Sequence, residues 1–90
     1  MDISKSDIIE SLAGRDKGKF FYVIDTEDNY VFLADGKGRK LENPKRKKLK
    51  HVRKAARIDS LVVSKIHSGD KVLNSELRRT LAEYRQSQSL

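Results

Sequence analysis

The chain has 90 residues, a formal net charge of +7 and no cysteine. This length allows one small domain, and the lack of cysteine excludes a disulfide framework and a thiolate metal site. The N-terminal stretch has acidic residues where an export signal would have basic ones and lacks a long apolar run, and no stretch approaches the roughly 20 apolar residues of a membrane span. We therefore expect a soluble, cytoplasmic protein that does not bind membranes.

A short apolar segment at residues 7–13 fits the spacing of a helix or of a strand. We favour a strand, because Gly14 and Gly18 then bracket a loop that leads into the next apolar segment. Glycine there permits positive φ and close backbone approach.

Two aromatic and β-branched segments follow, at Phe20–Ile24 and Tyr30–Ala34, with turn-forming residues between them. This pattern predicts an antiparallel hairpin. Asp35-Gly36 indicates a further turn. The stretch RKLEN, residues 39–43, then predicts a short return strand that ends at Pro44.

The positive charge is concentrated in residues 37–57, which contain eleven Lys or Arg and a single acid. The rest of the chain has nine basic and twelve acidic residues. Leu49, Val52 and Ala56 have helical spacing, although a short strand over 49–52 fits equally. Because apolar residues lie among the lysines, we expect the segment to be pinned to the body of the protein. So little compensating acid indicates a polyanionic partner.

The last third predicts two helices. Asp59 or Ser60 would cap the first, and Gly69 would end it. Asn74 or Ser75 would cap the second, whose apolar stripe should dock on the β-structure or on the first helix. That stripe consists of Leu77, Leu81 and Tyr84.

The loop GRDKGK, residues 14–19, is a candidate phosphate-binding loop. We expect its exposed backbone N–H groups and its cations to face one place, as phosphate oxygens require. The alternative is a solvated turn whose cations keep the protein soluble.

The stretch GRDKGKFFYVIDTEDNYVFLADG, residues 14–36, resembles the KOW family of small SH3-type barrels. KOW domains occur in large-subunit ribosomal proteins and in transcription elongation factors. Gly18 stands in the place of the hallmark glycine. The similarity covers about residues 6–54. This part of the chain resembles a bacterial KOW family that is akin to an archaeal and eukaryotic large-subunit ribosomal protein.

The resemblance implies a mainly β fold, with a five-stranded SH3-type barrel over residues 1–57 and a helical appendage over 58–90. The implied strands are 7–13, 19–26, 29–35, 38–42 and 48–53. The expected barrel core is Ile9, Phe21, Val23, Val31, Leu33, Leu41, Leu49 and Val52. Phe20, Tyr22 and Tyr30 should face outward or lie under the C-terminal helices.

The candidate RNA-binding residues lie in the 14–19 loop, the 35–40 turn and the run 45–54, which holds seven cations within ten residues. Ordinary solvated surface is the alternative for all three, and a nuclear-localisation signal is a further alternative for the third. His51 would stack on a base or bind phosphate, or else only pack. The set is Arg15, Lys17, Lys19, Lys37, Arg39, Lys40, Lys45, Arg46, Lys47, Lys48, Lys50, His51, Arg53 and Lys54.

We expect an RNA-binding module, ribosome-associated or ribosomal in type, that contacts the phosphates of structured ribosomal RNA and neighbours ribosomal proteins. One alternative is a KOW module that binds proteins and uses the basic run for steering. Another is nonspecific binding to duplex DNA. Tyr22 and Tyr30 would stack on unpaired bases or pack on the outer face.

Catalysis is not expected. No nucleophile has a credible base nearby in the sequence, and neither a P-loop nor a dinucleotide fingerprint is present. Two histidines 16 residues apart do not make a zinc site. We therefore expect no enzyme activity, no cofactor and no small-molecule substrate.

Overall fold

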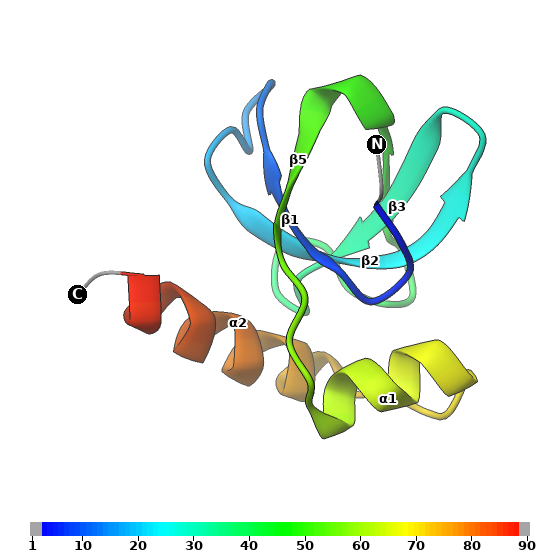
Figure 1. Cartoon of the computed structure of the whole chain (residues 1–90), viewed down its shortest axis with the longest axis vertical. Helices are drawn as coiled ribbons and strands as arrows, with labels where there is room; N and C mark the ends of the chain where they lie inside the picture. Colours follow the sequence, from blue (N-terminus) through cyan, green and yellow to red (C-terminus); the bar gives the residue numbers. More distant parts are fainter. Residues whose placement is uncertain (1–2, 89–90) are drawn as a thin grey trace.

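One antiparallel sheet of five strands is covered on one side by two helices in the computed structural model, which describes residues 3–88 (Figure 1). The strands lie in the order β4-β3-β2-β1-β5, and no pairing between β4 and β5 closes the sheet within that range. The elements are β1 (Ile8–Ser11), β2 (Phe20–Glu27), β3 (Tyr30–Ala34), β4 (Lys45–Lys48), the 3₁₀-helix η1 (Leu49–His51), β5 (Val52–Ala56), α1 (Leu61–Ser68) and α2 (Asn74–Gln88).

The predicted hairpin and the strand before it are confirmed as β1, β2 and β3. The return strand predicted at 38–42 is wrong, because local hydrogen bonds close that segment into a turn. Asp35 Oδ1 accepts hydrogen bonds from the N–H groups of Lys37 and Arg39, both at 2.9 Å. The Leu41 N–H donates to Asn74 on α2 instead of to a neighbouring strand. The fourth strand begins only after Pro44, and the fifth is β5 at 52–56 instead of 48–53.

Both helices form in the predicted part of the chain. Ser60 caps α1 by accepting a hydrogen bond from the Val63 N–H at 3.2 Å, and Gly69 ends it with φ of 78°. The predicted capping role of Asn74 is wrong, because its side chain binds residues 41 and 42. Glu76 supplies the cap of α2, since its carboxylate accepts a hydrogen bond from the Leu73 N–H at 3.0 Å.

The core has two layers, one on each face of the sheet, because successive strand residues point to opposite sides. The layer away from the helices contains Ile9, Phe21, Val23, Val31, Leu33 and Val52, all predicted, and the half-buried Leu49 packs against it. The prediction that Leu41 belongs to the same layer is wrong, because Leu41 is partly buried against the helix-side layer. That second layer contains Ile8, Tyr22, Ala34, Val62, Val63, Ile66, Leu77, Leu81 and Tyr84.

The helices are packed directly on the sheet. The Tyr22 hydroxyl donates to Thr80 Oγ1 at 2.9 Å, and the Phe20 ring meets the Tyr84 ring edge-on, with centroids 5.1 Å apart. Phe20 and Tyr22 therefore lie under the C-terminal helices, as expected. Neither helix in the described range has the length and apolar character needed to cross a lipid bilayer.

Candidate nucleic-acid interface

The loop at residues 12–19 is fastened to β4 by a buried ionic contact. The Asp16 carboxylate accepts hydrogen bonds from Lys45 Nζ at 2.8 Å, Lys47 Nζ at 2.7 Å and Ser11 Oγ at 2.7 Å. Lys47 Nζ also donates to the Ala13 carbonyl oxygen at 2.6 Å. These contacts hold the loop along the edge strand that carries much of the predicted basic run.

The backbone of this loop has the predicted positive φ angles, but its N–H groups form hydrogen bonds within the protein. Gly14 and Gly18 have φ of 85° and 86°. The N–H groups of Lys17, Gly18 and Lys19 donate to carbonyl oxygens within residues 11–16. The expectation that exposed N–H groups of the loop receive phosphate is therefore wrong for these three residues. Its three predicted cations, Arg15, Lys17 and Lys19, are exposed.

The strand register decides which side chains of β4 face outward. Lys45 and Lys47 lie opposite Leu33 and Val31, which belong to the core, whereas Arg46 and Lys48 alternate with them. The Lys47 side chain is only 8% exposed, so it stabilises the loop instead of facing solvent. We therefore leave Lys47 out of the proposed contact surface, although the sequence suggested it.

The first of three neighbouring hollows brings together the loop and the turn that the sequence singled out separately. It has a volume of about 240 Å³ and its basic lining comes from Arg15, Lys19, Arg39 and Lys45. The remaining lining residues are Asp16, Phe21, Asp35 and Gly38. Segments more than 15 residues apart in sequence thus present four cations around one depression.

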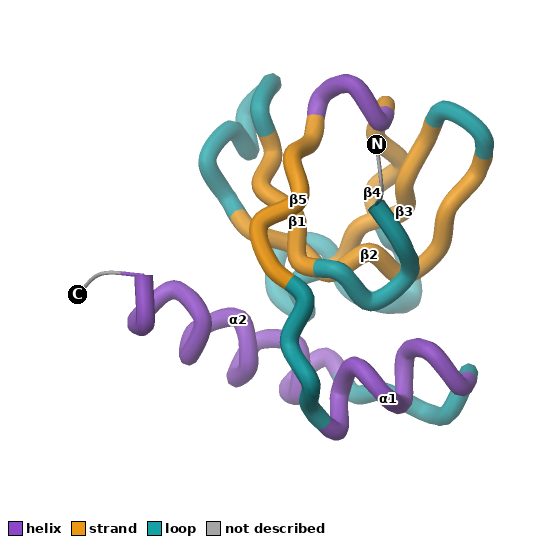
Figure 2. Tube along the Cα trace, in the orientation of Figure 1, coloured by secondary structure: helices purple, strands orange, loops and turns teal. Residues whose placement is uncertain are grey.

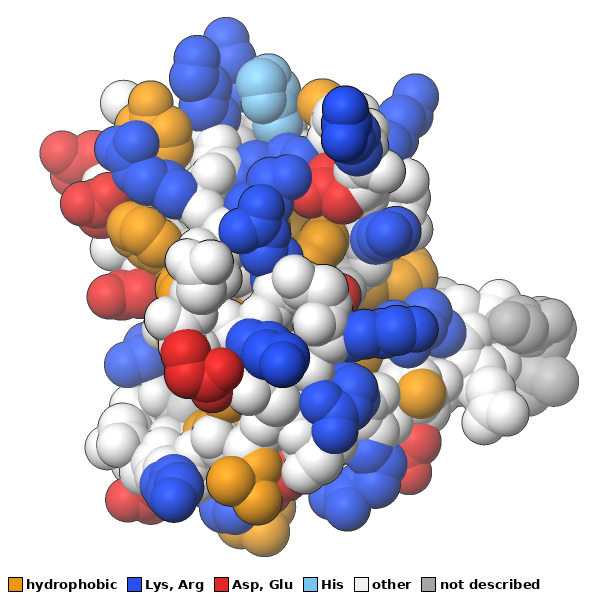
Figure 3. Space-filling view, turned by 180° about the vertical axis from the view of Figure 1, so that it is seen from behind, with side chains coloured by type: hydrophobic (Ala, Val, Ile, Leu, Met, Phe, Trp, Pro, Cys, Tyr) orange, Lys and Arg blue, Asp and Glu red, His pale blue; other side chains and the backbone are white. Residues whose placement is uncertain are grey.

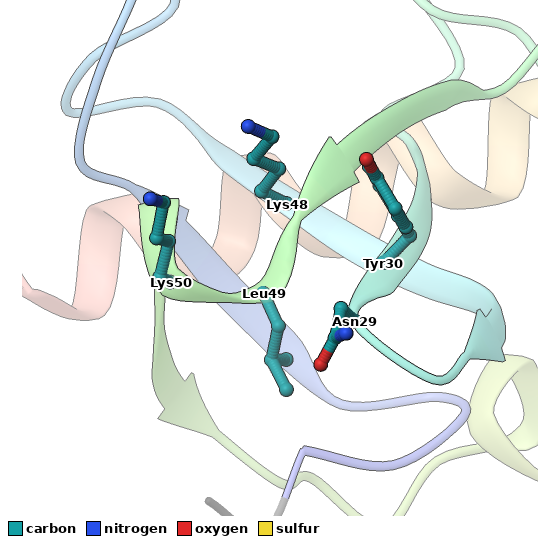
Figure 4. A pocket seen from close by; sticks show the side chains of 5 residues that line it. All are labelled: Asn29, Tyr30, Lys48, Leu49 and Lys50. Carbon is teal, nitrogen blue, oxygen red and sulfur yellow. The ribbon is translucent and has the colours of Figure 1, made fainter.

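Two further hollows share Tyr30 and Lys48. One, of about 430 Å³, is also lined by Ala13, Gly14, Arg46, Lys47 and His51. The other, of about 470 Å³, is also lined by Asn29, Leu49 and Lys50 (Figure 4). The 12–19 loop, the β2–β3 turn and η1 lie at the end of the sheet away from the helices (Figure 2).

We call the cationic surface around these hollows the basic face. The view from behind shows Lys and Arg side chains spread over the molecule, with a few acidic side chains among them (Figure 3). The face consists of Arg15, Lys19, Arg39, Lys45, Arg46, Lys48, Lys50 and His51.

The structure does not bring every predicted residue to this face. Arg53 and Lys54 lie on β5, which is the other edge in the strand order, and pair with Glu10 and Asp7. Lys17, Lys37 and Lys40 are exposed but are not among the residues that line the three hollows.

The basic run is less unbalanced in space than in sequence. Carboxylates from residues 7–27 form ion pairs with six cations of the segment 45–57: Lys45, Arg46, Lys47, Arg53, Lys54 and Arg57. The expectation of little compensating acid, which was based on residues 37–57 alone, is therefore wrong. Lys48 and Lys50 have no carboxylate partner within residues 3–88, and both are exposed.

One feature of the face was not predicted. The Arg46 guanidinium lies over the Tyr30 ring, 3.5 Å from its centroid, and Arg46 Nε donates to Glu27 at 3.3 Å. A cation over an aromatic face is a favourable contact, and here it fixes the ring. Predicting this contact would have needed the register of β3 with β4. That register places Tyr30 opposite Lys48, so that Arg46 is its diagonal neighbour two residues earlier in β4.

No protein-family model and no curated protein matches the chain. The likeness to KOW domains therefore stays a prediction from the residues that carry it, and the basic face is the main indication of function. Within residues 3–88, no group of three or more His, Asp or Glu side chains is placed to hold a metal ion.

The Asp16 contact should make stability depend on acid. Burial raises the pKa of Asp16, but hydrogen bonds from Lys45, Lys47 and Ser11 outweigh burial and hold the pKa well below its ordinary value. A depressed pKa gives stability that is complete above the unfolded-state pKa of about 4 and is lost as pH falls toward the folded-state pKa. We expect the free energy of unfolding, measured in urea, to fall more steeply below about pH 4 in the wild type than in Asp16→Asn.

The comparison isolates one carboxylate, because the substitution leaves the other acids in place. The difference in stability between the two proteins should be constant near neutral pH and should shrink on acidification. A constant difference down to pH 2 would show that Asp16 does not hold its proton-free form through these contacts.

Proposed function

We propose that the protein binds structured RNA through the basic face, as a ribosome-associated or ribosomal-type protein of the cytoplasm. The carrying observation is that cations of the 12–19 loop, the 35–40 turn, β4 and η1 line three hollows, one of which joins the loop to the turn. Lysine and arginine held in this way neutralise phosphates and release their counterions. In this proposal the curved sheet is a KOW-type, SH3-like barrel.

Phosphate contact supplies affinity without reading the base sequence. The cations of the face have different uses within it. Lys48 and Lys50 are exposed and lack carboxylate partners in residues 3–88, so phosphate contact costs them no internal ion pair. Arg46 pairs with Glu27 where both side chains are about half exposed, and such surface pairs are weak enough to exchange for phosphate.

The test is binding of a structured RNA by fluorescence anisotropy over a range of salt concentrations. If roughly 5–8 phosphates are neutralised, log K against log salt should have a slope of about −4 to −7. We expect Lys48→Gln/Lys50→Gln to bind at least about tenfold more weakly near physiological salt, with a slope shallower by about 2. Its thermal midpoint should match that of the wild type, because neither lysine has a carboxylate partner in the described chain.

The matched control is Lys71→Gln/Arg79→Gln, which removes the same charge from exposed positions after α1 and on α2. It should bind nearly as the wild type does. Equal losses in both variants would mean that only net charge matters, and the basic face would not be the site. Salt-insensitive binding to a protein instead of RNA, or stronger competition by duplex DNA than by RNA, would contradict the proposal.

A further inference from the structure

Tyr30 occupies an unusual place on the basic face, since it lines two of the three hollows. It is the first residue of β3 and is half-buried. Backbone contacts fix the structure around it, because the Leu49 N–H donates to the Asn29 carbonyl oxygen at 2.8 Å and ties η1 to the β2–β3 turn. The ring therefore stands at the rim of a preformed depression, not on a loose tail.

The ring is oriented by its neighbours. Arg46 covers part of one face, and Glu27 holds Arg46. Tyr30, Lys48 and Lys50 extend toward the same side of the ribbon, whereas Asn29 and Leu49 extend toward the opposite side (Figure 4). Leu49 thereby packs against the core layer on that face of the sheet. An aromatic ring and two ammonium groups that have no carboxylate partner within residues 3–88 therefore lie on the same side of the ribbon.

The chemistry of this hollow is more specific than phosphate binding needs. Its volume of about 470 Å³ falls within the ~300–1,000 Å³ of sites that hold small organic groups. No carboxylate lines it, and its lining combines an aromatic side chain with two lysines. Proteins that bind single strands pair aromatic rings, on which bases stack, with cations that follow the backbone. A paired helix does not offer a free base face to such a ring.

We propose that an unpaired nucleobase stacks beside Tyr30 in this hollow while Lys48 and Lys50 hold the adjoining phosphates. The inference depends on the proposed function and adds a selection to it: RNA with accessible unpaired nucleotides binds more tightly than a fully paired RNA of the same charge. Arg46 supports the site by covering one face of the ring, so that the base stacks on the other face.

The test compares two RNA probes of equal length, a hairpin with an unpaired loop and a blunt duplex. Tyr30→Leu is expected to weaken binding to the hairpin by about tenfold or more, the size that loss of one stacked base implies, and to leave duplex binding unchanged. Tyr30→Phe keeps the ring and should bind both probes nearly as the wild type does. A 2-aminopurine in the hairpin loop should be quenched on binding to the wild type and to Tyr30→Phe, and not on binding to Tyr30→Leu.

The outcomes separate the two proposals. Wild-type protein that binds neither probe overturns the proposed function and this inference together. Wild-type protein that binds both, with Tyr30→Leu unaffected on both, overturns only the stacking site. Equal weakening on both probes, matched by Arg46→Gln, overturns it as well, because the ring would then act only by placing Arg46.

Discussion

Replacing Asp16 by asparagine is expected to lower the free energy of unfolding by about 3 kcal/mol. The carboxylate accepts hydrogen bonds from both Lys45 and Lys47, and its side chain is only 11% exposed. Its loss leaves the Lys47 ammonium, 8% exposed, with the Ala13 carbonyl as its remaining partner. Removing one partner of a buried ion pair is costly because the other charge stays buried. Urea denaturation near neutral pH measures the effect.

The matched control is Glu27→Gln, which breaks the ion pair with Arg46 where both side chains are about 55% exposed. That change should cost less than about 1 kcal/mol. Adding Lys47→Met to Asp16→Asn removes the buried charge and should recover part of the loss, since an apolar replacement of a buried pair is often neutral. If Asp16→Asn behaves like Glu27→Gln, the contact does not stabilise the fold.

The same contact links stability to function. Asp16 holds the loop that carries Arg15 and Lys19 against β4. When it is lost, amide hydrogen exchange should accelerate at Gly18 and Lys19, whose N–H groups donate to the carbonyl oxygens of Ser11 and Asp16. RNA binding should weaken in the same variant under conditions in which the protein stays folded. Loosening the loop without any loss of affinity would show that its cations do not contribute.

Local chemistry predicted much of this fold. The ends of α1 follow from Ser60 and Gly69, which act on residues within a few positions of themselves. The hairpin of β2 and β3 follows from alternation and a turn. The 38–42 segment does not form a strand because side chains accept its backbone N–H hydrogen bonds. Asp35 accepts from Arg39, and Asn74, which lies 33 residues from Leu41, accepts from Leu41. The contact with Asn74 is tertiary, so local sequence did not indicate it.

The candidate site was predicted as segments but not as a geometry. Sequence indicated that the 14–19 loop and the 35–40 turn carry cations, and the structure places Arg15 and Arg39 around one hollow. It could not separate Lys47 from Lys48, because the pairing of β4 with β3 decides which of these two alternating side chains faces the core. It also counted the run as uncompensated, since its acidic partners lie far away in sequence.

Replacing Gly36 by alanine is expected to destabilise the protein by about 3 kcal/mol, as the sum of backbone strain and a steric clash. Gly36 has φ of 78°, which costs alanine roughly 1–2 kcal/mol. An added Cβ would lie 2.1 Å from the Asn74 carbonyl oxygen, in the first turn of α2. Backbone cannot retreat as a flexible side chain would, so the turn and α2 must move apart. Thermal and urea unfolding measure the loss.

Gly18→Ala is the matched control, because Gly18 has φ of 86° and an added Cβ would meet nothing within 4 Å. The two variants share the backbone strain, so the difference between them isolates the contact with α2. Equal destabilisation would mean that the contact is soft and that α2 does not fix the turn.

This contact gives the helices a part in the proposed function. Arg78 donates a hydrogen bond to the Gly36 carbonyl oxygen at 2.6 Å, and the Asn74 side chain accepts one from the Leu41 N–H at 2.8 Å. Residues of α2 therefore bind the 35–41 segment near both of its ends. That segment places Arg39 at the first hollow. Gly36→Ala should therefore weaken RNA binding more than Arg39→Gln does. The displaced turn would move Arg39 and would also change the shape of the hollow that Arg39 and Lys45 line together. Unchanged RNA affinity in a folded Gly36→Ala protein would separate the helices from the site.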